Sequence, residues 1–484
     1  MWSRLPGADD YPVTELITGL HMSPLELLVL LSAAVLVAAR WLPLPARPRV
    51  TVVTAAVFLL SAITLVVAGP RWQLVPALAG AALALPFALS PVLRRGPARR
   101  ARWWLALPGT LACAGLVVTA PVAAWAFPVP EFPVPSGDHA VGTRVLEWTD
   151  PDRPETFTED PGDHRTIVAQ LWYPAEDVAA DAPRAQYLGR TEAEAHTVAE
   201  AIAGGVGLPG FLVDGVPRAR THAVPDARVA DGRFPVVLFS PGAGGVRTQN
   251  TAWAEELASR GYVVAALDHL YDSAAVVLAD GRMITTKTIS SGDRDQDEKL
   301  AADWTAIRAA DLVSTLTHLA GPTPLSDHLD LTRTAVTGHS MGGAAALQAA
   351  RQDRRFAAVI DLDGYPHGPT TPDLTQPALA LTQTVTPDTD PRYLSRLTEA
   401  LTHSTGKSYR LTIPDTAHLT FMDGPLYLPP VPSIVGSLGR TESPRVVAAT
   451  TLAFLDAVLR DKSTDLNATL STYGDLTVHE PPAE

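Results

Sequence analysis

The segment Gly338-His-Ser-Met-Gly-Gly343 has the residue types of a nucleophile elbow, in which a serine stands on a sharp turn between a strand and a helix. The sequence pattern predicts that a strand ends before this segment, at Thr334–Thr337, and that a helix follows it, at Ala344–Arg351. Small residues on both sides of Ser340 would let the strand and the helix pack closely around an exposed hydroxyl group. The pattern therefore predicts that Ser340 is a nucleophile.

A serine hydroxyl is a weak nucleophile unless a neighbouring base takes its proton. His418 ends the loop Pro414–His418, which directly follows the predicted strand Ser408–Ile413. His403 precedes the same strand and would lie at its opposite end. In an α/β sheet the chemistry gathers beyond the carboxyl ends of the strands, so His418 is the predicted base.

The acid that orients the histidine should lie between the serine and the histidine in the chain. Asp363 follows the predicted strand Ala357–Leu362, and Asp361 lies two residues earlier. Asp388 and Asp390 follow the next strand, which is the other position that suits this role. The residues favour Asp363 and leave the other three aspartates as alternatives.

Attack of a serine on a carbonyl carbon also needs two N–H donors that stabilise the oxyanion formed during the reaction. Met341 directly follows the nucleophile, and the loop Ser240–Gly245 is rich in glycine and follows the predicted strand Pro235–Ser240. We expect the amides of Met341 and Ala243 to form this oxyanion hole. The single cysteine, Cys113, excludes a cysteine-based zinc site, and no metal or cofactor is expected.

The elements that position these residues alternate between strands and helices from residue 166 onward. This alternation predicts the α/β class, with a mostly parallel sheet covered by helices on both faces. We expect an α/β-hydrolase fold over residues 166–462, with a cap insert at about 186–220. A Pro-rich linker and entry loop is predicted at 131–165, and a C-terminal tail at 463–484.

The first 130 residues form a chemically different region. Arginines cluster after the first and the third of its four apolar runs, which the positive-inside rule assigns to the cytoplasm. We therefore expect a multi-pass membrane region with the catalytic domain on the extracytoplasmic side. The four apolar runs, each long enough to span a bilayer, lie at about 24–42, 50–69, 72–93 and 103–127.

The charge of the chain is divided unevenly between these two regions. Residues 1–130 carry a formal balance of +6, and the remainder carries −19. An acidic catalytic region without a long basic stripe argues against nucleic acid as a partner. The expected partners are a small-molecule or lipid ester and the membrane, and the sequence carries no signal of an oligomeric state.

Three segments carry a resemblance to a known family: FPVVLFSPGAGGVRTQN, GHSMGGAAALQAARQDRRFAAVIDLDG and PDTAHLTF. Over about residues 166–460 the chain resembles the platelet-activating-factor acetylhydrolase family of α/β hydrolases. Pro241 stands where that family has a histidine, and the four predicted spans are an addition to it. The resemblance implies a serine esterase or lipase, and it points to the same site residues: Ser340, Asp363, His418 and Ala243.

Together the residues and the resemblance predict a membrane-anchored serine hydrolase that cleaves lipid-like or short-acyl carboxylic esters. Polyester hydrolases and dienelactone-type hydrolases share much of the pattern, and an envelope acyltransferase would form the same acyl-enzyme. The alternative from another class is a non-catalytic binding module on a hydrolase fold. The complete set of serine, histidine, aspartate and oxyanion loop argues against that module.

Overall fold

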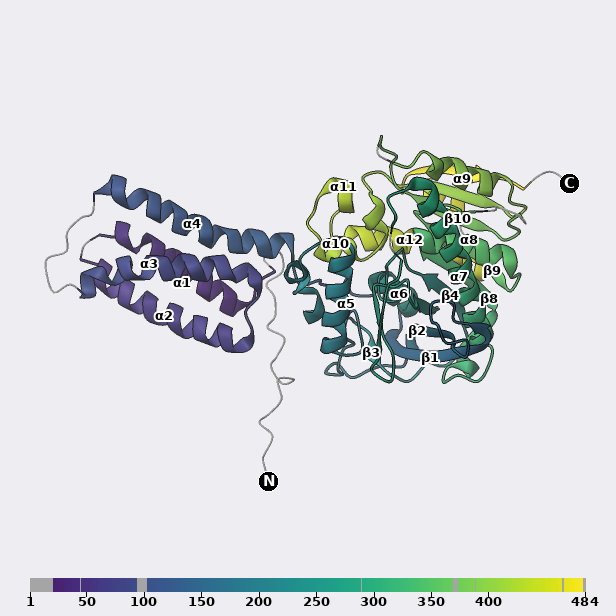
Figure 1. Ribbon diagram of the computed structural model, residues 1–484, viewed down its shortest axis with the longest axis horizontal. Helices are drawn as coiled ribbons and strands as arrows, with labels where there is room; N and C mark the ends of the chain where they lie inside the picture. The colour runs from purple at the N-terminus through teal and green to yellow at the C-terminus, as the bar shows by residue number, and fades with distance from the viewer. Residues whose placement is uncertain are drawn as a thin grey trace, which may run out of the picture. The chain divides into compact units, whose positions relative to one another are not determined.

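The chain divides into two compact units, Met1–Val129 and Pro130–Glu484, and each is described by itself (Figure 1). Two groups of residues used in the sequence analysis fall outside the described residues. They are Asp388 and four arginines of the loop between the third and fourth predicted spans: Arg94, Arg95, Arg99 and Arg100. The computed structural model describes residues 21–43, 45–93, 102–288, 290–368, 373–387, 389–463 and 465–481.

In the described part of the first unit, four helical segments are long and apolar enough to cross a membrane. Large apolar side chains on their outer surfaces are exposed, among them Leu60, Val67 and Leu111. Such surfaces are typical of helices that face lipid, because water would not favour so many exposed apolar groups. The helices are α1 (Pro24–Ala38), α2 (Arg47–Ala68), α3 (Val75–Leu93) and α4 (Trp103–Ala126).

Glu26, the one acidic residue within the predicted spans, is neutralised by an arginine. Its carboxylate accepts hydrogen bonds from Arg71 Nε at 2.7 Å and from Arg71 Nη2 at 2.9 Å. The same carboxylate accepts from the Ser23 amide at 2.7 Å, which completes a capping box at the start of α1. The acidic side chain at the start of the first predicted span is therefore paired and hydrogen-bonded, as a buried charge must be.

In the described residues of the second unit, ten strands form one sheet in the order β12-β11-β10-β9-β8-β4-β5-β2-β1-β3. The central strands from β11 to β5 are parallel, while β2 and β12 run antiparallel to their inner neighbours. A separate hairpin joins β6 (Ala275–Val277) and β7 (Met283–Thr285). The sheet strands are β1 (Ala140–Pro154), β2 (His164–Ala175), β3 (Val224–Pro225), β4 (Phe234–Ser240), β5 (Val263–His269), β8 (Leu329–His339), β9 (Phe356–Leu362), β10 (Ala378–Thr382), β11 (Ser408–Thr412) and β12 (Asp475–His479).

Helices pack on both faces of this sheet, as the alternation of elements predicts (Figure 1). One apolar cluster contains Trp253 and Phe454 from the helices of the first face, and another contains Leu312 and Leu397 from the second. The central strands contribute to both clusters and are buried on both sides, which explains their continuous apolar sequences. The first face carries α6 (Thr251–Ser259) and α12 (Glu442–Leu459); the second carries α7 (Arg294–Leu319), α8 (Met341–Gln352) and α9 (Arg392–Thr402).

Two segments that the sequence analysis placed outside the sheet are strands within it. Residues 140–154, predicted as part of a linker, form β1 and pair antiparallel with β2. Residues 475–479, predicted as part of a tail, form β12 on β11. Outer strands keep one face partly exposed and need no continuous apolar run. These two segments are polar, so the apolar pattern used to predict strands did not identify them.

The insert predicted at 186–220 is partly helical. It contains α5 (Glu192–Gly205), and a bridge between Gln186 and Arg220 closes its base. Glu194 of α5 pairs at 2.8 Å with Arg247, which also pairs with the buried Asp268 at the end of β5. The buried ion pairs attach the insert to the carboxyl edge of the sheet.

Candidate active site

Ser340 stands alone between β8 and α8 in a strained backbone conformation, with φ of 57° and ψ of −123°. Its amide donates to the Leu362 carbonyl at 2.9 Å, and its own carbonyl accepts from the Gly343 amide at 2.9 Å. A Cβ at Gly338 would lie 2.1 Å from the Gly342 carbonyl oxygen, so the turn excludes a side chain there. The predicted strand, sharp turn and helix around Ser340 are confirmed.

The predicted acid and base lie in direct contact. Asp363 follows β9, and His418 follows β11 and begins a short 3-10 turn. His418 Nδ1 lies 2.6 Å from Asp363 Oδ2; the Asp363 side chain is buried, and that of His418 is 42% exposed. A carboxylate beside Nδ1 accepts a hydrogen bond from the N–H of that nitrogen, which leaves Nε2 as the basic nitrogen.

The second oxygen of the Asp363 carboxylate is also occupied. Oδ1 accepts hydrogen bonds from the Gln383 amide at 2.7 Å and from the Tyr393 hydroxyl at 2.5 Å. Burial, and then the charge of Asp363, raises the pKa of Tyr393 well above its ordinary value, so the phenol stays a donor. These contacts stabilise a buried carboxylate in one orientation. The sequence analysis did not identify Tyr393, because no motif or spacing connects the start of α9 with Asp363.

The other candidate acids do not contact His418 in the described part of the chain. Asp361 is buried and accepts from the Gly364 amide at 3.0 Å; burial, and then the charge of Asp363, raises the pKa of Asp361 well above its ordinary value. Asp390 pairs with Arg392 at 2.7 Å. Asp388 lies outside the described residues, so its position relative to His418 stays untested.

The loop after β4, residues 240–245, runs beside the nucleophile turn. A Cβ at Gly242 would lie 3.6 Å from Ser340 Cβ. In the residues that the structure describes, the amides of Ala243 and Met341 donate no hydrogen bond. Met341 is the first residue of α8, where an amide has no acceptor within the helix. Neither amide thus has a competing acceptor among the described residues, and their role as oxyanion donors stays a prediction.

His339 connects the loops on the two sides of Ser340. Its Nδ1 lies 3.0 Å from Gln249 Nε2, and its Nε2 lies 3.0 Å from the backbone carbonyl oxygen of His418. An amide nitrogen can only donate and a carbonyl oxygen only accept, so Nε2 carries the proton. Burial, and then the neighbouring His418, lowers the pKa of His339 to about 3, which keeps the ring neutral.

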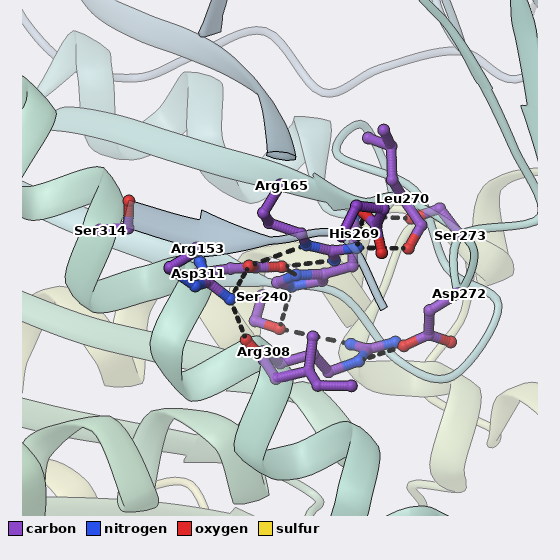
Figure 2. A network of polar contacts seen from close by, with 12 residues as sticks. Arg153, Arg165, Ser240, His269, Leu270, Asp272, Ser273, Arg308, Asp311 and Ser314 are labelled. Atoms are coloured by element: carbon purple, nitrogen blue, oxygen red, sulfur yellow. Dashed lines mark hydrogen bonds and ion pairs between the residues drawn. The ribbon is translucent and has the colours of Figure 1, made fainter. Parts of the chain in front are cut away.

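A second Ser-His-Asp arrangement lies within the core (Figure 2). Ser240 Oγ lies 2.8 Å from His269 Nε2, and His269 Nδ1 lies 2.8 Å from Asp311 Oδ2. All three residues are at most 1% exposed, and Asp311 also pairs with Arg165 at 2.8 Å. A substrate cannot reach this hydroxyl, so the arrangement is a structural network. In the described part of the chain, no group of three or more His, Cys, Asp or Glu could hold a metal ion.

The sequence is similar to two hydrolase families. Residues 126–300 match the family described as platelet-activating factor acetylhydrolase, isoform II, and residues 221–407 match the dienelactone hydrolase family. A probable 1-alkyl-2-acetylglycerophosphocholine esterase of Arthroderma benhamiae is 28% identical over 246 residues, which is 48% of this chain and 58% of that protein. Platelet-activating factor acetylhydrolase of Bos taurus is 28% identical over 170 residues, 30% of this chain and 38% of that protein. The matched region thus spans less than two thirds of either relative.

The fold is also similar to a solved structure. A ferulic acid esterase from Streptomyces cinnamoneus superposes with a TM-score of 0.60 and is 29% identical in sequence. The similarity covers 72% of this chain and 99% of that chain. Sequence and structure comparisons therefore agree on a carboxylic ester hydrolase as the kind of protein that this chain resembles.

Proposed function

We propose that this chain, an α/β hydrolase of the platelet-activating-factor-acetylhydrolase-like type, is a membrane-anchored serine hydrolase that cleaves carboxylic esters. The observation that carries the proposal is the 2.6 Å contact between His418 and Asp363, formed at the same sheet edge as the strained turn of Ser340. The named relatives, all esterases or hydrolases, support the reaction class.

In the proposed reaction, His418 Nε2 takes the Ser340 hydroxyl proton while Ser340 Oγ attacks the carbonyl carbon of the ester. Asp363 holds the imidazole in the required tautomer and stabilises the imidazolium that forms. The amides of Ala243 and Met341 donate to the oxyanion of the tetrahedral intermediate. His418 then gives its proton to the departing alkoxide, which leaves as an alcohol and leaves Ser340 acylated.

Water completes the cycle by the same steps. His418 Nε2 takes a proton from a water molecule as that water attacks the acyl carbon of Ser340. The second tetrahedral intermediate uses the same two amide donors. Its collapse returns the proton to Ser340 and releases a carboxylic acid, so the site is regenerated.

The substrates that we propose are lipid-like or short-acyl esters. Four apolar helices would hold the enzyme at a bilayer, where amphiphilic esters concentrate. Arginines cluster in the loops after the first and third spans, and the positive-inside rule assigns such loops to the cytoplasm. Four spans then favour the extracytoplasmic side for the catalytic unit. The acetylated glycerophosphocholine in the name of one relative supports a substrate of this class.

The test uses the full-length protein in detergent and a fluorophosphonate probe, followed by peptide mapping. The probe should modify Ser340, and Ser340→Ala should lose both the modification and the turnover of p-nitrophenyl acetate. Ser395→Ala, an exposed serine on α9, is the matched control and should keep both. Undiminished turnover in Ser340→Ala would remove the mechanism, and modification of Ser240 would move the chemistry to the second Ser-His-Asp arrangement.

A further inference from the structure

One buried arginine holds the carbonyl groups of the loop beside Ser340. Arg308 of α7 is fully buried, and its Nη2 donates to the Gly242 carbonyl at 2.9 Å. Its Nη1 donates to the Pro241 carbonyl and, at 3.3 Å, to Ser240 Oγ. A single guanidinium group therefore contacts three consecutive residues of this loop.

Arg308 is itself held in place from its other side. Figure 2 shows the guanidinium between Ser240 and Asp272, and Arg308 Nε lies 2.5 Å from a carboxylate oxygen of the fully buried Asp272. Separating a buried pair of opposite charges would leave each charge without a partner, which is strongly unfavourable. The ion pair with Asp272 therefore holds the guanidinium group of Arg308 in one orientation. Its planar fork can span two carbonyl oxygens at once, which the single ammonium group of lysine does not do with the same geometry.

The orientation of one carbonyl determines the orientation of the next amide. The Gly242 carbonyl and the Ala243 N–H belong to one planar peptide group, and in a trans peptide they point in opposite directions. Since the Gly242 oxygen faces Arg308, the Ala243 N–H points away from Arg308. That amide donates to no acceptor in the described part of the chain.

The other amides of the loop have acceptors. The Gly242 amide donates to Gln249 Oε1 at 3.1 Å, and the Gly245 amide donates to the Gly242 carbonyl at 2.9 Å. The Gly244 amide lies 3.5 Å from Asp272 Oδ1. The loop is thus fixed around Ala243. Among the described residues, the Ala243 amide is the one loop amide without an acceptor, and it is the amide that the proposed mechanism needs.

We propose that Arg308 is a positioning residue for the oxyanion hole, because it holds the Pro241 and Gly242 carbonyls and thereby aims the Ala243 amide at the substrate. The inference rests on the proposed ester hydrolysis at Ser340. Arg308 acts through the loop and does not touch the substrate. A donor aimed in advance stabilises charge that develops only in the transition state, so its loss lowers kcat and leaves KM nearly unchanged.

The test replaces Arg308 in the full-length protein by lysine. Turnover of p-nitrophenyl acetate should fall on the order of 10²-fold, as expected when one oxyanion donor is lost, with KM within about threefold of the parent. The inhibition constant of a short-chain trifluoromethyl ketone should rise by the factor by which kcat/KM falls. Its hemiketal with Ser340 carries the same oxyanion, so a purely structural role for Arg308 would not link the two quantities.

Arg165→Lys is the matched control. Arg165 belongs to the same buried network and pairs with Asp311 at 2.8 Å, but it makes no contact with residues 240–245 in the described part of the chain. This variant should be less stable than the parent. Its kcat, calculated from the concentration of sites that react with the fluorophosphonate probe, should equal that of the parent. If Arg308→Lys does not fold, the double variant Arg308→Gln/Asp272→Asn removes both charges of the pair and carries the same prediction.

The outcomes separate the two proposals. A folded Arg308 variant whose kcat and inhibition constant stay within about threefold of the parent would overturn the inference and leave the proposed function intact. An equal loss of kcat in Arg165→Lys would also overturn it, because the effect would then belong to the network as a whole. A parent protein that neither reacts with the probe nor turns over the ester would instead overturn the proposed function, and this inference with it.

Discussion

His418 Nδ1 lies 2.6 Å from Asp363 Oδ2, although 55 residues separate the two in the chain. They follow strands that are not neighbours, because β10 lies between β9 and β11. Parallel strands place the loops after their carboxyl ends at one edge of the sheet, where such loops can meet. Asp363 has a φ of 58° and so leaves the extended conformation of β9 directly after the strand ends.

The first prediction concerns this contact. Asp363→Asn should lower turnover on the order of 10⁴-fold, because the imidazole loses the partner that sets its tautomer and stabilises its charge. Asp390→Asn is the control and should stay within about tenfold of the parent, since Asp390 pairs with Arg392. The measurement is kcat of each variant after cooperative unfolding has been checked. The acid would instead belong to the loop after β10 if the kcat of Asp390→Asn collapsed while that of Asp363→Asn stayed near the parent value.

The second prediction concerns the donor behind the acid. Tyr393→Phe removes the hydroxyl that donates to Asp363 Oδ1, a hydrogen bond to a charged group worth about 1.5–3 kcal/mol. We expect kcat to fall about tenfold or more, with KM nearly unchanged. Tyr365→Phe is the control, because its hydroxyl donates to Asp390 at 3.3 Å and not to Asp363. Equal turnover in both variants would show that Tyr393 does not support the acid.

The third prediction concerns pH. The pKa of His339 is lowered to about 3 in the folded protein from an ordinary value of 6.5, so the unfolded chain binds a proton that the folded chain does not. Stability should therefore fall as the pH decreases from about 6.5 toward 3, at up to about 1.4 kcal/mol per pH unit for this group.

The variant His339→Gln tests this pH dependence. Glutamine keeps one acceptor for Gln249 and one donor for the His418 carbonyl, but it does not titrate. Urea unfolding of the parent and the variant should give a shallower loss of stability in the variant between about pH 6.5 and pH 4. Parallel curves would show that His339 does not contribute to the acid sensitivity.

The fourth prediction concerns the side of the membrane. In a Cys113→Ala background, a cysteine at Gly96 should be protected from an impermeant thiol reagent in intact cells, while a cysteine at Val134 should react. Gly96 belongs to the predicted cytoplasmic loop and lies outside the described residues. Val134 is 75% exposed, whereas a Cβ at the nearby Gly137 would lie 2.2 Å from the Ser259 carbonyl oxygen. The reverse pattern of labelling would place the catalytic unit in the cytoplasm.

The sequence by itself determined the features that depend on neighbouring residues. The glycines around Ser340 and the apolar periodicity on either side predicted the strand, turn and helix, because close packing at a sharp turn is a local requirement. Apolar runs of membrane-spanning length predicted the four long helices, because the length and composition of a run are also local properties. Outer strands such as β1 escaped prediction, since a strand with an exposed face carries a weaker local signal.

Only the tertiary structure decided which distant residues meet and which are buried. The spacing left several aspartates open, and the meeting of two loops selected Asp363 as the partner of His418. Ser240, His269 and Asp311 repeat the residue types of a triad, with contacts of 2.8 Å, but all three are buried and Ser240 lies on a strand, not on a strained turn. Arg308 donates a hydrogen bond to Pro241, which lies 67 residues earlier in the chain. Burial, charge pairing and the direction of a peptide group depend on packing between elements, which no local pattern contains.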